Sequence, residues 1–367
     1  MTIFLISLYW FTVGFLVVAT LVPFSKIPHG AIRSFAFPRE QFFVLALVIF
    51  AIGLFFLDGQ QRIVGLIATG SVIVVNAIYI AKFTPLWRTQ SVDATPEERE
   101  DDSRRVTLIA SNVKQSNRDY AKLINLIKTE KPDIATALEV DAAWVDALYS
   151  ALKDDFQHWV KVDQENSYGM VLMSRLPLDE TEVRELLVEG VPSIRTRVRM
   201  DSGQAWRLYI VHPEPPVPYH DTKGRDGEIA LIGMEAKKDP LPSIVTGDLN
   251  DVAWSTTTRR FQALSGLLDP RIGRGFYNTF HAGVALARWP LDHLFHDPEF
   301  RLIRLARMPN VGSDHFPILF SFALSDTAKA HYLPEASTEE EREDVKEIVE
   351  DERKADREAI GTDWEKG

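Results

Sequence analysis

Two short segments carry side chains suited to phosphate-ester chemistry. Gly247-Asp248-Leu249-Asn250 and Gly312-Ser313-Asp314-His315 each lie where an apolar, strand-like run meets a loop. Cleavage of a phosphate ester requires a hard cation to neutralise the phosphate, a base or positioned water for the attack, and a donor for the leaving oxygen. Asp, Asn and His together can fill these roles. Each segment alone is weak evidence, because Asp-x-Asn after a strand is also ordinary turn chemistry.

Three further segments place similar side chains at the ends of apolar runs. They are Leu138-Glu139-Val140, Val211-His212-Pro213 and Leu291-Asp292-His293-Leu294. A carboxylate such as Glu139 needs compensation at the end of an apolar run, and a bound cation supplies it. Asp248 and Asn250 are two residues apart, so in an extended segment both side chains would face the same side.

In this order, the five segments resemble the endonuclease/exonuclease/phosphatase superfamily, with its DNase I-like fold, over roughly residues 104–325. The resemblance is greatest to a bacterial branch that has membrane spans ahead of the catalytic domain. It implies a four-layer α/β sandwich of the DNase I-like type, preceded by three transmembrane helices. It also implies an Mg²⁺-dependent hydrolase, with Mn²⁺ as the alternative ion. One departure is Leu138, where the superfamily usually has Gln.

The resemblance implies a role for each candidate residue. The implied metal ligands are Asn112, Glu139 and Asp314. The implied catalytic residues are Asp248 at the attacking water, Asn250 at the phosphate, His212 and His315 in the active site, and Asp292 as the carboxylate that orients His315. Tyr168 either packs or donates a hydrogen bond to a phosphate oxygen. The sequence leaves open whether Asp248 or a histidine is the base.

The elements that position these residues alternate between strand and helix patterns. Strand signals cover residues 106–112, 134–140, 168–174, 194–200, 205–212, 243–248, 291–295 and 315–322. Helical patterns occur at residues 120–127, 142–153 and 222–238. Strands with intervening helices, followed by hairpin-like pairs, predict an α/β sandwich with mixed sheets.

Three apolar stretches precede this part of the chain. Residues 3–23, 41–57 and 63–81 are nearly free of charge and close to the roughly 20 apolar residues that cross a bilayer. A cleaved signal peptide explains the first stretch less well, because it lacks a basic start and a small-residue cleavage site. We predict four regions: a membrane domain at 1–83, a linker at 84–105, a catalytic domain at 106–325 and an acidic, disordered or helical tail at 326–367.

Composition excludes some kinds of chemistry. The chain has no Cys, which excludes disulfides, zinc-thiolate sites and thiol nucleophiles. Residues 335–367 supply −8 of the formal charge of −11, so the rest of the chain is nearly neutral. A nucleic-acid substrate stays open, but no Lys/Arg block flanks the site segments to support it. P-loop, zincin, nucleophile-elbow and dinucleotide-binding motifs are absent.

Two functions compete at this point. The first is a membrane-anchored, metal-dependent phosphodiesterase or phosphatase that hydrolyses a nucleic acid, nucleotide or phospholipid headgroup by in-line water attack. The second is a catalytically idle membrane scaffold that retains the fold and binds partners through its acidic tail. The sequence specifies neither the substrate nor the oligomeric state.

Charges near the spans predict the orientation in the membrane. The side shared by the first loop and the catalytic domain carries Lys26, Arg33, Arg39, Lys82 and Arg88, against Arg62 on the other side. The positive-inside rule therefore predicts a bacterial cytoplasmic membrane protein whose catalytic domain lies in the cytoplasm. An extracytoplasmic domain is the alternative, because the start of the chain is uncharged and the cations are scattered.

Overall fold

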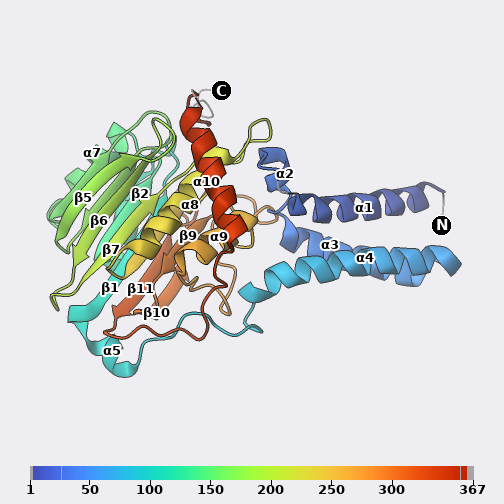
Figure 1. Cartoon of the computed structure of the whole chain (residues 1–367), viewed down its shortest axis with the longest axis horizontal. Coiled ribbons are helices and arrows are strands. Elements are labelled where there is room, and N and C mark those ends of the chain that lie inside the picture. Colours follow the sequence, from blue (N-terminus) through green and yellow to red (C-terminus); the bar gives the residue numbers. More distant parts are fainter. Residues whose placement is uncertain (1–2, 26, 356, 362–367) are drawn as a thin grey trace.

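Two β-sheets pack face to face between two layers of helices, and three long apolar helices project from one side (Figure 1). The computed structural model describes residues 3–25, 27–355 and 357–361, so Lys26, Asp356 and the chain ends at 1–2 and 362–367 lie outside the described residues. The layered arrangement confirms the α/β sandwich predicted from the sequence.

The first sheet has six strands in the order β10-β11-β1-β2-β4-β3, and the second has five in the order β5-β6-β7-β8-β9. The strands of the first sheet are β1 (Arg105–Asn112), β2 (Ile134–Leu138), β3 (His158–Val162), β4 (Met170–Ser174), β10 (Phe300–Arg307) and β11 (Ile318–Leu324). Those of the second are β5 (Leu178–Glu185), β6 (Pro192–Arg199), β7 (Ala205–Val211), β8 (Ser243–Asp248) and β9 (Asp292–His296).

Strand pairing brings ends from both sheets together. β1 runs parallel to β2, and β7 runs parallel to β8, so their carboxyl ends lie side by side. β11 and β9 run antiparallel to β1 and β8, which puts their amino ends beside those carboxyl ends. Asn112 at the end of β1 donates a hydrogen bond of 3.1 Å to Asp248 at the end of β8, so the two sheets meet here. We call these converging strand ends the site edge.

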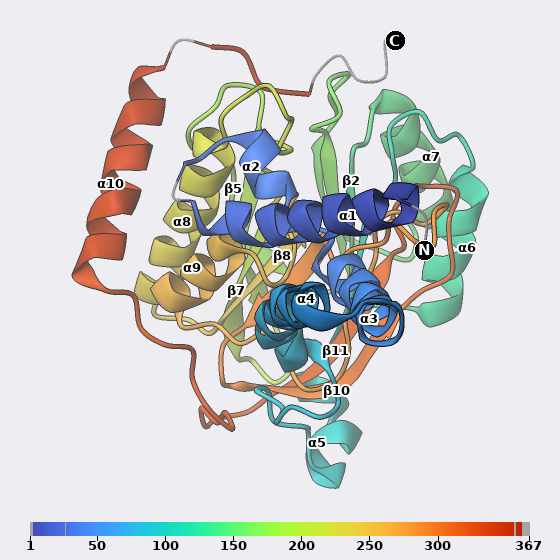
Figure 2. The ribbon, with the colours of Figure 1, turned by 90° about the vertical axis from the view of Figure 1, so that its right-hand side faces the viewer.

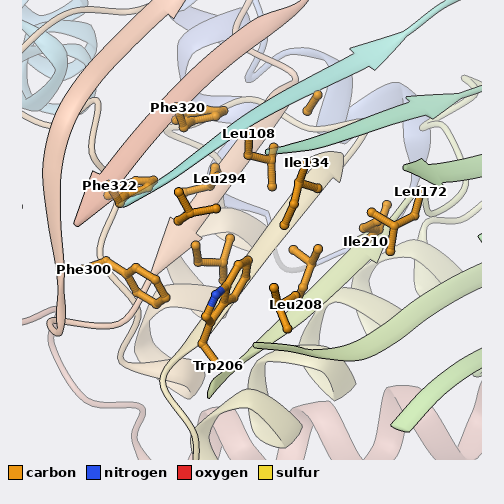
Figure 3. Packing of buried hydrophobic residues seen from close by; sticks show 14 of the residues in the cluster. Leu108, Ile134, Leu172, Trp206, Leu208, Ile210, Leu294, Phe300, Phe320 and Phe322 are labelled. Atoms are coloured by element: carbon orange, nitrogen blue, oxygen red, sulfur yellow. The ribbon is translucent and has the colours of Figure 1, made fainter. Parts of the chain in front are cut away.

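The main core fills the space between the two sheets (Figure 3). Leu108 and Ile134 from the first sheet and Leu208 and Ile210 from the second are buried in it. Ile109, between two core residues of β1, points to the other face of its sheet and packs with Met308 and Leu319. The alternation follows from the two-residue period of a strand, and both faces are apolar because helices cover the outer one.

Two pairs of helices form the outer layers. α6 (Tyr120–Glu130) and α7 (Ala142–Leu152) pack on the first sheet. α8 (Lys223–Lys238) and α9 (Thr256–Ser265) pack on the second. Their buried side chains give the sheets an apolar outer face without contributing side chains to the site edge.

Three strands and one helix of the sandwich differ from the sequence-based expectation. β3, β5, β10 and α9 were not predicted. β5 reads LDETEVRE and most of its side chains are exposed, so it lacks the alternating apolar pattern on which a strand prediction depends. β10 reads FRLIRLAR, with Arg at every third position, so it also lacks the two-residue apolar alternation of a strand.

The three apolar helices agree with the predicted spans. They are α1 (Ile3–Leu21), α3 (Arg39–Phe56) and α4 (Gly59–Ile80), each long and apolar enough to cross a membrane. Much of their surface is exposed and apolar, as with Phe11 and Phe55. Seen from the side on which they project, they stand in front of the sandwich (Figure 2). The short helix α2 (Gly30–Ser34) lies in the segment between α1 and α3.

The acidic tail contains a helix, α10 (Glu339–Lys354), which agrees with the helical alternative predicted for this region, and one face of the helix is packed. Val345 and Val349 are one helical turn apart and pack against Ala230 of α8 and Leu264 of α9. The acidic side chains on its other faces mask this narrow apolar stripe in the sequence. Beyond the helix, both terminal nitrogens of Arg357 contact Glu214 at 2.7 Å.

Candidate active site

The site edge brings the nine side chains predicted from the sequence together. Six of them form one hydrogen-bonded or ion-paired group, made by Asn112, Glu139, His212, Asp248, Asp292 and His315. Asn250 joins the group through its backbone, Asp314 is held by Lys114, and Tyr168 packs against His212. Asn112 ends β1, Glu139 follows β2, His212 follows β7, and Asp248 ends β8. Asp292 begins β9, whereas Asp314 and His315 precede β11. These positions are far apart in sequence and depend on the parallel pairs and the antiparallel neighbours described above.

Gly247 permits the close approach of β7 and β8 beside the site. Its φ is +147°, and a Cβ at this position would lie 1.8 Å from the carbonyl oxygen of Val211. Because no side chain fits there, Gly247 lets the strand ends that carry His212 and Asp248 lie next to each other.

Asn112 links two of the carboxylates. Its Nδ2 donates hydrogen bonds to Glu139 Oε1 at 2.6 Å and to Asp248 Oδ2 at 3.1 Å. Burial raises the pKa of Glu139 to about 7, with the hydrogen bond from Asn112 opposing this rise and the charges of Asp314 and Asp248 adding to it. The charge of His315 also opposes the rise, so the charge of Glu139 is only partly compensated by the protein around it.

His315 is held by carboxylates on both ring nitrogens. Nδ1 lies 2.8 Å from Asp292 Oδ2, and Nε2 lies 3.4 Å from Asp248 Oδ2. Burial lowers the pKa of His315, but Asp292 and Asp248 raise it more, to about 10, so the ring is an imidazolium at neutral pH. The hydrogen-bonding distance between Asp292 and His315 is the geometry that the family resemblance implies.

His212 has the opposite electrostatic character. Burial lowers its pKa to about 4, so the ring is neutral at pH 7. Its Nε2 lies 4.0 Å from Glu139 Oε1, and its Nδ1 is buried without a hydrogen-bond partner within the described chain. The ring of Tyr168 lies 5.5 Å from that of His212, and the Tyr168 hydroxyl donates to the carbonyl of Ile360. This favours packing over a phosphate hydrogen bond as the role of Tyr168.

Asn250 lies beside the site, but it does not reach this position by sharing one face of an extended strand with Asp248. β8 ends at Asp248, and Asn250 has a left-handed backbone with φ of +51°, so the two side chains do not share one face of an extended strand. The Asn250 backbone N–H donates to Asp248 Oδ1 at 2.9 Å, and its Nδ2 donates to the carbonyl of Pro213 at 2.9 Å. Asn250 thus ties the loop after β8 to the loop after β7.

Three neighbouring residues were missed by the sequence analysis. Lys114 Nζ lies 3.1 Å from Asp314 Oδ2 and brings a cation to the site. Thr279 accepts a hydrogen bond from the backbone of Asp292, and the ring of Phe280 lies 4.9 Å from that of His315. For Lys114, its position two residues after Asn112 was a signal in the sequence that it lies close to the site.

Backbone conformation sets this region apart as well. Lys114, Glu139 and Asn250 have φ values of +59°, +60° and +51°. A left-handed conformation costs a non-glycine residue roughly 1–2 kcal/mol, and such conformations cluster at functional sites.

The donor set fits a hard divalent cation. The closest acidic and histidine ligand atoms in the described structure, on Asp248, Asp292 and His315, lie within 4.8 Å of one another. Both nitrogens of His315 already face carboxylates, so this trio is better explained as a charged hydrogen-bond network. Glu139 instead has an amide and a neutral histidine as neighbours, and its only partly compensated oxygen atoms are the kind that Mg²⁺ and Mn²⁺ prefer.

A family match covers this site. The sequence profile of the Endonuclease/Exonuclease/phosphatase family matches residues 109–315, which is more than half of the chain and includes every predicted site residue. No curated protein matches the sequence.

Solved structures share the fold at low sequence identity. A humanized D. rerio TDP2 with 14 mutations is 17% identical, with 60% of this chain and 99% of that chain covered at a TM-score of 0.50. A D. rerio TDP2 in complex with a single-strand DNA product is 18% identical, with 59% and 98% covered at 0.50. A conserved protein of unknown function from Enterococcus faecalis V583 is 15% identical, with 60% and 100% covered at 0.50. At these identities the likeness supports the fold alone.

Proposed function

We propose, from the premise that this chain belongs to the endonuclease/exonuclease/phosphatase family, that it is a membrane-anchored, divalent-metal-dependent phosphodiesterase or phosphatase. The observation that carries the proposal is the excess of carboxylates at the site edge. Glu139, Asp248, Asp292 and Asp314 converge there, and the nearby cations are His315 and Lys114. A buried excess of negative charge is stable when a cation is bound, and phosphate chemistry needs that cation.

Glu139, Asn112 and Asp314 would hold the ion, Mg²⁺ or Mn²⁺. When bound, the ion neutralises the phosphate and polarises the bond that is attacked. Glu139 supplies the ligand charge, and the hydrogen bond from Asn112 fixes the direction of its oxygen. Lys114 holds the Asp314 carboxylate in place on the opposite side.

The remaining residues would position water and substrate. Asp248 has one oxygen near Asn112 and His315 and the other on the Asn250 backbone, so its orientation is set for holding or deprotonating the attacking water. His315, kept protonated by Asp292 and Asp248, would stabilise charge on the phosphate. Asn250 has a second N–H on Nδ2 for a phosphate oxygen, because one is used by Pro213. His212 would act as a neutral second histidine beside Glu139.

The idle-scaffold alternative has less support. A scaffold does not need a strained Glu139 backbone or a buried carboxylate that is only partly compensated. Its partner-binding arm would be the acidic tail, yet α10 packs against α8 and α9 of its own domain.

Attachment to a bacterial cytoplasmic membrane, with the catalytic domain in the cytoplasm, is also part of the proposal. Arg33 contacts Asp226 at 3.7 Å and Arg39 donates to Asn76 at 3.3 Å, so both cations also have a role in the fold. The charge bias near the spans still acts on the inserted chain. An alkaline phosphatase fusion after Phe322 tests the orientation: strong phosphatase activity would place the domain outside the cytoplasm.

Hydrolysis of a generic ester tests the enzymatic proposal. The full chain in detergent is expected to hydrolyse bis-p-nitrophenyl phosphate or p-nitrophenyl phosphate with Mg²⁺ or Mn²⁺, and to lose this activity with a chelator. Glu139→Ala serves as the site variant, and Glu185→Ala, at an exposed position on β5, serves as the matched control. Activity that survives both chelation and Glu139→Ala would overturn the proposal.

A further inference from the structure

The loops that leave the site edge contact the membrane-proximal part of the chain. The first is residues 213–222, directly after His212. Gly30 donates from its backbone to the carbonyl of His220 at 2.8 Å, and Thr222 donates to the carbonyl of Pro28 at 2.8 Å. A Cβ on Gly30 would lie 1.8 Å from the carbonyl oxygen of Val217, so the two segments touch at the backbone.

The second is the loop after Asp248. Trp254 donates its Nε1 hydrogen to the carbonyl of Ala36 at 2.7 Å, and its ring lies 6.0 Å from that of Phe83, just after α4. Trp254 and Val252 share one apolar cluster with Ile80 at the end of α4. A few packed side chains therefore connect the loop after the catalytic Asp248 with the end of the membrane span α4.

The third is the loop before Asp292. Glu40 and Gln41, in the first turn of α3, accept hydrogen bonds from Asn278 Nδ2 at 2.8 Å and from Trp289 Nε1 at 3.3 Å. Gln41 also donates to the carbonyl of Leu286 at 3.0 Å. The segment that contains residues 281–288 therefore lies beside the polar first turn of α3, at the start of a candidate membrane span.

This segment, which we call the insertion loop (residues 281–288), exposes apolar side chains. Leu286 is 85% exposed and Val284 is 47% exposed, although both lie next to a membrane span. In the first of the three loops, residues 213–222, Tyr219 is 70% exposed. Exposed apolar side chains beside a span, with an aromatic residue nearby, are typical of a surface that rests in the bilayer interface.

The insertion loop also adjoins the catalytic histidine. Phe280, directly before it, packs on His315, and Ala282 donates from its backbone to the carbonyl of Asp314 at 2.6 Å. Two guanidinium groups, on Arg288 and Arg307, lie 4.9 and 4.5 Å from the ring of Phe316. The same face therefore offers apolar side chains for acyl chains and cations for an anionic headgroup, next to the site.

We propose that the insertion loop dips into the leaflet beside α3 and that the site takes the phosphate ester of a membrane lipid headgroup. The second part rests on the proposed function. In the reaction, a water oxygen bonds to phosphorus while one ester P–O bond breaks; the water gives up a proton and the leaving alcohol takes one up. A lipid reaches this site by lateral diffusion, whereas a bulky soluble polymer would have to enter between the domain and the bilayer.

Insertion of the loop can be tested without any activity. The chain has no Cys, so single substitutions give specific labelling sites. Leu286→Cys and the control Val183→Cys, 48% exposed on β5, would each carry an environment-sensitive fluorophore in nanodiscs. Doxyl-labelled lipids are expected to quench the label at 286 and not the label at 183. Equal quenching, or none at 286, would overturn the insertion.

The substrate class is tested in the same discs, made of phosphatidylglycerol and phosphatidylethanolamine. Phosphorus NMR follows the lipid diester, and bis-p-nitrophenyl phosphate added to the same discs reports soluble diester hydrolysis. Replacing Val284 and Leu286 together by Asp should lower the ratio of lipid to soluble turnover by about tenfold or more, because their burial in lipid is lost. Val183→Asp should leave the ratio unchanged.

The outcomes separate the two proposals. Soluble hydrolysis without lipid hydrolysis, or an unchanged ratio in the double variant, overturns the lipid substrate and leaves the enzyme. If neither ester is hydrolysed, the proposed function fails and the lipid substrate fails with it.

Discussion

Two groups of buried charges lie close together and differ in their balance. One, which we call the docking cluster, contains Arg33, Arg225, Asp226 and Asp251. Arg225 contacts Asp226 at 2.8 Å and Asp251 at 3.2 Å, and Arg33 reaches Asp226 at 3.7 Å. Two cations thus meet two carboxylates. At the site edge, by contrast, carboxylates outnumber the neighbouring cations.

The pKa values follow this charge balance in part, because Asp226 and Glu139 differ as expected, whereas burial raises the pKa of Asp251 although Arg225 opposes the rise. Burial alone would raise the pKa of Asp226, but Arg225 and Arg33 hold it below its usual value. Burial raises the pKa of Glu139 to about 7, and no neighbouring Lys or Arg side chain is among the groups that oppose the rise. A balanced buried group stabilises the junction between spans and catalytic domain. A buried group with an excess of carboxylates, such as the site edge, can bind an additional cation from solution.

The largest expected effect is on the docking cluster. Arg225→Met leaves Asp226 and Asp251 buried with less compensation, which should cost about 3–5 kcal/mol of unfolding free energy. Thermal unfolding in one detergent measures the loss. The control is Arg304→Met, which breaks an exposed pair with Glu130 at 2.7 Å and should cost only about 0–1 kcal/mol. If the two variants lose the same unfolding free energy, the burial of the docking cluster does not make its ion pairs more important for stability than the exposed pair.

Glu139→Ala should separate activity from stability. We expect activity to fall by more than the about 10–100-fold that loss of an outer-shell partner costs, because a charged ligand is removed. Excess Mg²⁺ or Mn²⁺ should restore part of it. Thermal unfolding should be unchanged or shifted upward, since the variant removes an only partly compensated buried charge. A folded variant that does not respond to saturating metal would show that Glu139 is not a ligand.

Asp292→Asn should reduce turnover by about 10–100-fold with the fold intact, because an amide cannot stabilise the imidazolium of His315 and favours a different tautomer. Steady-state kinetics with the soluble diester measure kcat and KM. The fall should be mainly in kcat, and the alkaline limb of the pH profile should move to lower pH, since the raised pKa of His315 depends on Asp292. An unchanged pH profile would contradict the orienting role.

Arg357→Met should have the smallest effect. It leaves Glu214 without its bidentate partner in a buried position and should cost about 1–3 kcal/mol of unfolding free energy, compared with no change for Arg353→Met at an exposed position of α10.

The sequence alone predicts that removing residues 335–367 leaves hydrolysis nearly unchanged. The structure changes this expectation, because the truncation also removes the Ile360 carbonyl that holds Tyr168 against His212. Full turnover in the truncated chain would show that the contact between the tail and Tyr168 does not contribute to hydrolysis.

The sequence by itself determined the features that depend on local pattern. Apolar runs of the right length predicted the three spans, and short apolar runs that end in a polar residue predicted most central strands. Residue types at the ends of those strands pointed to the candidate site, because a buried strand leaves its polar end group at the edge of the sheet. The resemblance then supplied the pairing of Asp292 with His315, which the spacing of 23 residues could not have provided.

Only the tertiary structure decided the features that depend on contacts between distant residues. Lys114 meets Asp314 across 200 positions, and Trp254 meets Ala36 across 218. Edge strands such as β5 are stabilised by their neighbours rather than by their own apolar pattern, so they leave little trace in the sequence. Val345 and Val349 of the tail bury their side chains because α8 presents a complementary surface, which no periodicity within the tail can reveal. A sequence records each residue's chemistry, whereas the energy of a buried charge or an apolar stripe depends on what the fold places opposite it.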